Sequence, residues 1–100
     1  MAILFDLGQL VATQEVAEFI GDDKEFARFV WESLNRYTHG DWGVLEEPDI
    51  ELNEDAIREG GRILASYPIP EEIDIDWEDR IWIITEWGRS YTTIMFPTEY

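Results

Sequence analysis

The chain has 100 residues, 23 of them acidic and seven basic, which gives a formal net charge of −16 at neutral pH. This length suits one domain, residues 1–100, and a hydrophobic content of 45% with 14% aromatic residues predicts a folded core rather than acidic disorder. The charge excludes nucleic acid as a direct ligand, because phosphate binding needs a basic patch. The absence of cysteine excludes disulfides and thiolate metal sites.

The sequence gives no sign of a membrane or exported protein. No apolar run approaches the roughly 20 residues that span a bilayer. The first residues, M-A-I-L-F-D, lack the basic segment of a signal peptide. We therefore expect a cytoplasmic protein that does not bind membranes.

The first third of the chain predicts a strand and two helices. Residues 3–13 are β-prone, with Gly8 as a bend, and residues 14–20 could form a short helix. Residues 22–37 give the clearest helix, with Asp22 as the N-cap of a capping box. Its apolar stripe consists of Phe26, Phe29, Val30, Leu34 and Tyr37.

Two glycines enclose an Asp-Trp pair at residues 40–43, G-D-W-G. This spacing predicts a tight turn that aims the indole of Trp42. A plug at the edge of the core is favoured over a ligand contact, and a buried indole N–H then needs an acceptor.

The second main helix is expected at residues 50–60, within the stretch 46–61, where Pro48 suits the first turn and Gly60-Gly61 the end. An alternative start has Asn53 as the N-cap. A strand follows at 62–67. The outer face of the helix is acidic and carries Glu51, Glu54, Asp55 and Glu59.

Residues 80–87 and 90–96 are rich in Ile, Thr and aromatics and flank a short Gly-containing turn, which predicts a β-hairpin. Both faces of the first strand are apolar, which predicts helices on both faces of the sheet. The expected fold class is α+β: a small, mainly antiparallel sheet of about four strands packed by two main helices.

Glu71–Asp79 reads E-E-I-D-I-D-W-E-D and holds six acids in nine residues. The alternation puts Glu72, Asp74, Asp76 and Glu78 on one face if the segment is extended. An extended strand rises about 3.3 Å per residue, so carboxylates would then recur roughly every 6.6 Å. If the segment forms a loop, this row is lost. Residues 46–79 contain thirteen acids and two bases, a net charge of −11, so most of the excess charge is in the middle of the chain.

Enzymatic chemistry has little support in the sequence. The single histidine, His39, falls at a helix end, where a charge-capping role is more usual than general base catalysis. Asp74, Asp76 and Glu78 have the spacing that begins a calcium loop, but Asp79 stands where that loop needs glycine. We expect no catalytic residue, no metal site and no cofactor.

A protein partner with a basic surface is the better expectation. A dense carboxylate surface can mimic the phosphates of DNA and occupy a basic nucleic-acid groove. The predicted partner-binding residues are Glu51, Glu54, Asp55, Glu59, Glu72, Asp74, Asp76, Trp77, Glu78 and Asp79. Two alternatives remain open: an immunity or antitoxin protein that anchors a toxin through Trp77, Trp87 and Tyr91, and an acidic face that serves solvation or high salt.

Several short motifs resemble those of small plasmid-related proteins of mobile elements, some of which are labelled restriction-enzyme subunits. They span residues 40–100 and are Gly40-Asp41-Trp42-Gly43, Asn53-Glu54, Gly61-Arg62, Tyr67, residues 81–86, Arg89-Ser90, Thr92-Thr93 and residues 97–100. The family has a short turn where this chain has Glu71–Asp79. The resemblance implies a mobile-element setting and, by analogy, an inhibitor of a host defence system such as a restriction or CRISPR complex.

Overall fold

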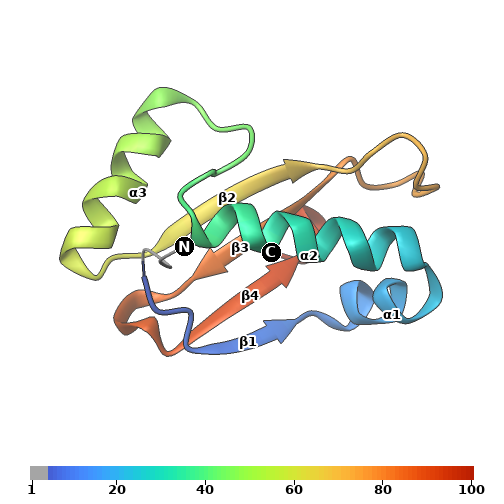
Figure 1. Ribbon diagram of the computed structural model, residues 1–100, viewed down its shortest axis with the longest axis horizontal. Helices are drawn as coiled ribbons and strands as arrows, with labels where there is room; N and C mark the ends of the chain where they lie inside the picture. Colours follow the sequence, from blue (N-terminus) through green and yellow to red (C-terminus); the bar gives the residue numbers. More distant parts are fainter. Residues whose placement is uncertain (1–4) are drawn as a thin grey trace.

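The computed structural model describes residues 5–100 and has an α+β fold (Figure 1). Its four strands are β1 (Gln9–Ala12), β2 (Ile63–Pro68), β3 (Arg80–Thr85) and β4 (Tyr91–Met95), in the sheet order β1-β4-β3-β2. The β3–β4 hairpin and the β2–β3 pair are antiparallel, whereas β1 runs parallel to β4. The predicted fold class, a small and mainly antiparallel sheet with helices, is confirmed.

Three α-helices accompany the sheet: α1 (Gln14–Asp22), α2 (Lys24–Thr38) and α3 (Glu47–Glu59). Figure 1 shows α2 crossing one face of the sheet and α3 lying beside the β2 edge. Phe19 of α1 packs against Phe26 of α2 and against Phe96, which directly follows β4 in the chain. This places α1 on the same face of the sheet as α2. On the opposite face, Trp82 packs against Tyr100 at 5.7 Å between ring centroids, and both line a pocket with Leu52 of α3.

The boundaries of α1, α2 and β1 differ from the predicted ones. Helix α1 continues through Gly21, and Asp23, not Asp22, caps α2 by accepting the backbone N–H groups of Glu25 and Phe26. The first strand begins at Gln9, and residues 3 and 4 of its predicted range lie outside the described residues. The five predicted core residues of α2 are all buried. Within residues 5–100, no helix is long and apolar enough to cross a membrane.

A chain of buried hydroxyl groups crosses the core. The Tyr37 hydroxyl lies 2.7 Å from Thr85 Oγ1, which lies 2.8 Å from Thr92 Oγ1. Thr92 in turn donates to the Leu7 carbonyl, so these bonds tie α2 to β3, β4 and the segment before β1. Burial raises the pKa of the Tyr37 phenol far above its usual value, so the phenol stays protonated as the network requires.

Two sets of hydrogen bonds pair backbone groups on the outer edge of β2. The side-chain amide of Asn53 donates to the Leu64 carbonyl at 2.7 Å and accepts the Leu64 N–H at 3.1 Å. Two residues along, Ser66 bonds the backbone of Trp42 and Val44. The buried Asn53 and the G-D-W-G turn therefore act together as a substitute for a neighbouring strand.

Candidate functional site

The acidic segment Glu71–Asp79 is a closed loop, not an extended strand. Its ends meet where the Ile69 N–H donates to the Asp79 carbonyl, and the buried Ile73 folds inward. With the ends paired, no neighbouring strand is available to hold the middle extended, so the segment forms turns and bends. Of the two conformations that the sequence left open, the structure has the loop, and the evenly spaced row of carboxylates is not formed.

The acids of this loop differ in burial and in ion pairing. Glu72, Asp74 and Asp76 are exposed and form no ion pair among the described residues. Glu78, expected on the same face, is only 8% exposed and accepts a hydrogen bond from the Thr98 hydroxyl. Asp79 pairs with Arg80 at 3.0 Å, and this guanidinium lowers the pKa of the Asp79 carboxyl.

The acidic face of α3 is exposed as predicted. Glu51, Glu54 and Glu59 form no ion pair within the part of the chain that is described, whereas Asp55 pairs with Arg58. The charge of the face is therefore reduced but not cancelled.

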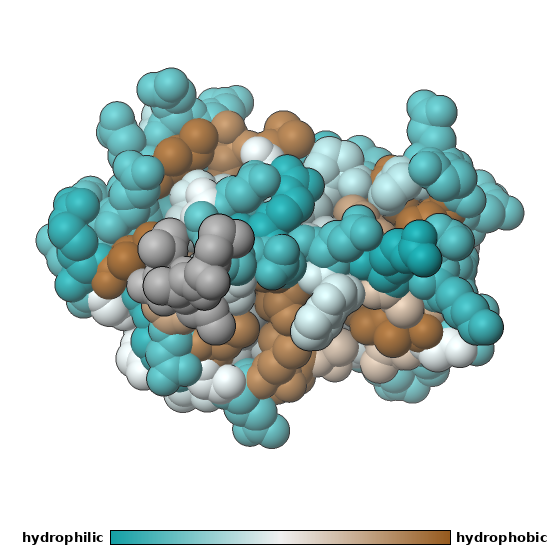
Figure 2. Space-filling model, viewed as in Figure 1, coloured by the Kyte–Doolittle hydropathy of each residue, from teal (hydrophilic) through white to brown (hydrophobic). Residues whose placement is uncertain are grey.

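The two acidic clusters lie far apart. Figure 1 shows α3 at one end of the sheet and the loop after β2 at the other, with β2 running between them. Figure 2 shows hydrophilic side chains projecting at both ends. The molecule is 37 Å long, so the predicted partner-binding residues form two separate surfaces instead of one continuous face.

The aromatic candidates are divided in the same way. Trp77 is 58% exposed and packs one side against Phe19, at 5.6 Å between centroids. Trp87 is 71% exposed beside Gly61, at the α3 end of the molecule, with Tyr91 close by in sequence. No single aromatic anchor patch joins all three.

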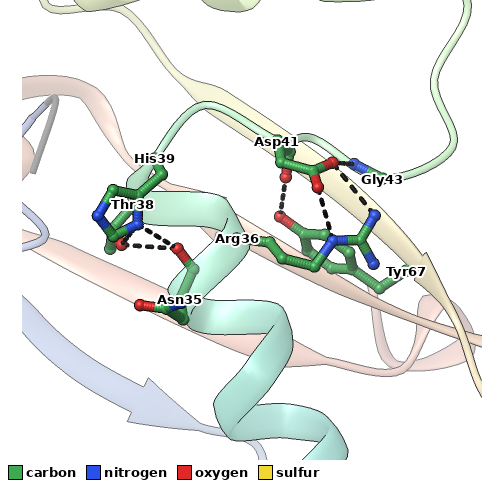
Figure 3. Close-up of polar contacts among 7 residues, drawn as sticks. All are labelled: Asn35, Arg36, Thr38, His39, Asp41, Gly43 and Tyr67. Atoms are coloured by element: carbon green, nitrogen blue, oxygen red, sulfur yellow. Dashed lines mark hydrogen bonds and ion pairs between the residues drawn. The ribbon is translucent and has the colours of Figure 1, made fainter. Parts of the chain in front are cut away.

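Metal-ligating side chains and His39 were weighed as candidates for chemistry from the sequence. Within residues 5–100 no three His, Asp or Glu side chains converge to hold a metal ion. The His39 Nδ1 donates to the Asn35 carbonyl at 2.7 Å, since a carbonyl can only accept, and so it caps the last turn of α2 (Figure 3).

The turn at residues 40–43 is built around Asp41, which Figure 3 shows between α2 and β2. Arg36 donates to both carboxylate oxygens at 2.8 and 3.1 Å, and the Gly43 N–H donates at 3.1 Å. The Asp41 carbonyl accepts the Tyr67 hydroxyl at 2.6 Å. Trp42 is then buried at the core edge, against Tyr37, which agrees with the prediction of a plug at the edge of the core.

The Arg36 guanidinium holds the pKa of the Asp41 carboxyl below its usual value of 3.8. A depressed pKa stabilises the fold above the ordinary pKa, and this contribution is lost as the pH falls through the native value. We expect Asp41→Asn to lower the free energy of unfolding by about 1 kcal/mol at pH 7, because both partners are half exposed. Urea titrations should show this difference disappearing as the pH falls below the native pKa of Asp41, and a difference that persists once the carboxyl is protonated would contradict an ion-pair origin.

An open groove of about 580 Å³ lies between the acidic loop, the start of β3 and the short helix at Pro97–Glu99. Its lining includes Asp76, Trp77 and Glu78 from the loop. Trp82 and Thr98 complete it, and neither was singled out as a binding residue from the sequence. The only available signal for Trp82 was its place opposite the two buried isoleucines of β3.

Comparisons with protein-family models, with curated proteins and with solved structures found no match. The fold and the acidic clusters describe the class of this protein: a small α+β protein with two acidic surfaces, at opposite ends of one sheet.

Proposed function

We propose that this protein is a non-enzymatic acidic inhibitor that occupies a basic, nucleic-acid-binding surface of another protein. The observation that carries the proposal is the excess of unpaired acid. Four of the 23 acids pair with arginine, and the other 19 have no basic side chain within 4 Å among residues 5–100. A surface of this kind is attracted to positive proteins at long range and repels nucleic acid.

The spacing of the two clusters supports mimicry of a duplex. The molecule is 37 Å long, comparable with one turn of duplex DNA, about 34–36 Å. A basic groove that follows a DNA duplex could therefore contact the loop and α3 together. A restriction or CRISPR complex of a host defence system is the kind of target we propose, in line with the resemblance to plasmid-related proteins.

Two charge-matched variants test this function on proteins captured by the chain from host lysate. One replaces Glu72, Asp74 and Asp76 by Gln or Asn, and the other replaces Glu51, Glu54 and Glu59 by Gln. Each removes three negative charges. We expect the loop variant to weaken partner binding by about tenfold or more, and the helix variant to weaken it less.

Competition experiments with the captured protein distinguish mimicry of nucleic acid from non-specific electrostatic binding. Duplex or single-stranded nucleic acid should compete with the chain for its partner, and the affinity should fall steeply with salt. Retained binding in both variants, or a partner that binds nucleic acid and the chain simultaneously, would reject the proposal.

An immunity or antitoxin protein is the second candidate, favoured by the exposed indoles of Trp77 and Trp87. Such a complex depends on aromatic anchors in a shaped interface. Trp87→Ala would then weaken binding more than the loss of three acids, and the salt dependence would be shallow.

A further inference from the structure

The groove beside the acidic loop combines aromatic walls with a buried carboxylate. Trp77 contributes an indole that is more than half exposed, and Trp82 contributes one that is half buried. Glu78 lines the same groove although it is only 8% exposed. Its carboxylate accepts a hydrogen bond from the neutral hydroxyl of Thr98 and forms no ion pair among the described residues, so its negative charge lacks a cation there.

The one base that lines the groove is already engaged. Arg80 donates to both carboxylate oxygens of Asp79, at 3.0 and 3.3 Å. Asp76 and Glu78 therefore remain as unneutralised acids of the groove. A buried carboxylate without a cationic partner is costly, and a cation that enters beside it gains more than at an exposed acid.

An arginine side chain has the chemistry that such a groove recognises. A guanidinium stacks on an indole face and can donate two parallel hydrogen bonds to a carboxylate. An ammonium group makes neither the stacked contact nor the fork. A neutral or anionic group would leave Glu78 without a counter-charge.

We propose that this groove receives an arginine side chain of the partner, between Trp77 and Trp82 with the guanidinium at Glu78. The inference rests on the proposed function and deepens it, since it names the group of the basic surface that the loop binds. The acids outside the groove attract the partner, and the groove selects arginine.

The test uses a blocked Gly-Arg-Gly peptide as the probe, with matched lysine and citrulline peptides, and follows indole N–H signals of the labelled full chain by NMR. We expect the arginine peptide to shift the signals of Trp77 and Trp82 with a dissociation constant of about 1–10 mM, in the range of single contacts. The lysine peptide should bind at least threefold more weakly, and citrulline, which is neutral, should not bind.

Two variants of equal charge locate the binding. Glu78→Gln keeps an acceptor for Thr98 and should weaken arginine binding at least fivefold, whereas Glu71→Gln, on the same loop but outside the groove, should change it less than twofold. Trp77→Ala, at an exposed side chain, should also weaken binding without loss of the folded spectrum.

Equal effects of Glu78→Gln and Glu71→Gln would overturn the inference, as would shifts spread over both ends of the molecule or no binding at all. Equal binding of lysine would overturn the assignment to guanidinium. These outcomes are distinct from failure of the proposed function, which depends on capture and competition by nucleic acid. A partner displaced by nucleic acid with no arginine site in the groove would leave that function standing.

Discussion

Replacing Gly43 with alanine is expected to lower the free energy of unfolding by about 4 kcal/mol, from a left-handed backbone and a steric clash together. Gly43 has φ of 74°, and a Cβ atom there would lie 2.0 Å from the Ser66 carbonyl oxygen. That carbonyl accepts the Val44 N–H at 2.8 Å, so the backbone cannot move away without breaking the β2 edge. The total free energy of unfolding of a native protein is only about 5–15 kcal/mol, so this loss is a large fraction of it.

Alanine variants at two other glycines distinguish the cost of the left-handed backbone from the cost of the steric clash. Gly60 also has positive φ, 82°, but nothing lies within 4 Å of its would-be Cβ, so Gly60→Ala should cost only about 1 kcal/mol. Gly21 lies inside α1 with open space around it, and Gly21→Ala should stabilise by about 0.5 kcal/mol. Thermal and urea unfolding should rank the three variants in this order, and similar costs at Gly43 and Gly60 would refute the close-approach explanation.

Replacing Asn53 with alanine should cost about 3 kcal/mol, the second largest effect. Asn53 is 4% exposed, and its amide pairs both the N–H and the carbonyl of Leu64. Truncation leaves two backbone groups of β2 without partners at a mostly covered position. Urea unfolding of Asn53→Ala measures the loss, and a wild-type midpoint would show that water or a shifted helix replaces the amide.

Two further variants sharpen this prediction. Leu52→Ala, at the neighbouring and 64% exposed position, should change stability by less than about 0.5 kcal/mol. Asn53→Asp keeps an acceptor for the Leu64 N–H but loses the donor to the carbonyl at neutral pH. Its deficit should shrink as the pH falls, because the protonated carboxyl group can donate again.

The sequence alone determined the elements whose signals are local. The apolar stripe of α2, the Pro48 and Gly60 boundaries of α3 and the β3–β4 hairpin depend on spacing and backbone preference within a few residues. The acidity of the α3 outer face was also readable, because helical periodicity fixes which residues share a face. These features are as predicted.

The tertiary structure decided everything that depends on distant neighbours. The alternation in Glu71–Asp79 fits both a strand and a loop, and only the bond between Ile69 and Asp79, which closes the loop, excludes the strand. That closure buries Glu78 beside Thr98 and brings Trp77 and Trp82 to one groove. Periodicity describes one segment at a time, whereas the burial and the partners of a residue depend on other segments. The separate clusters and the groove therefore became visible only in three dimensions.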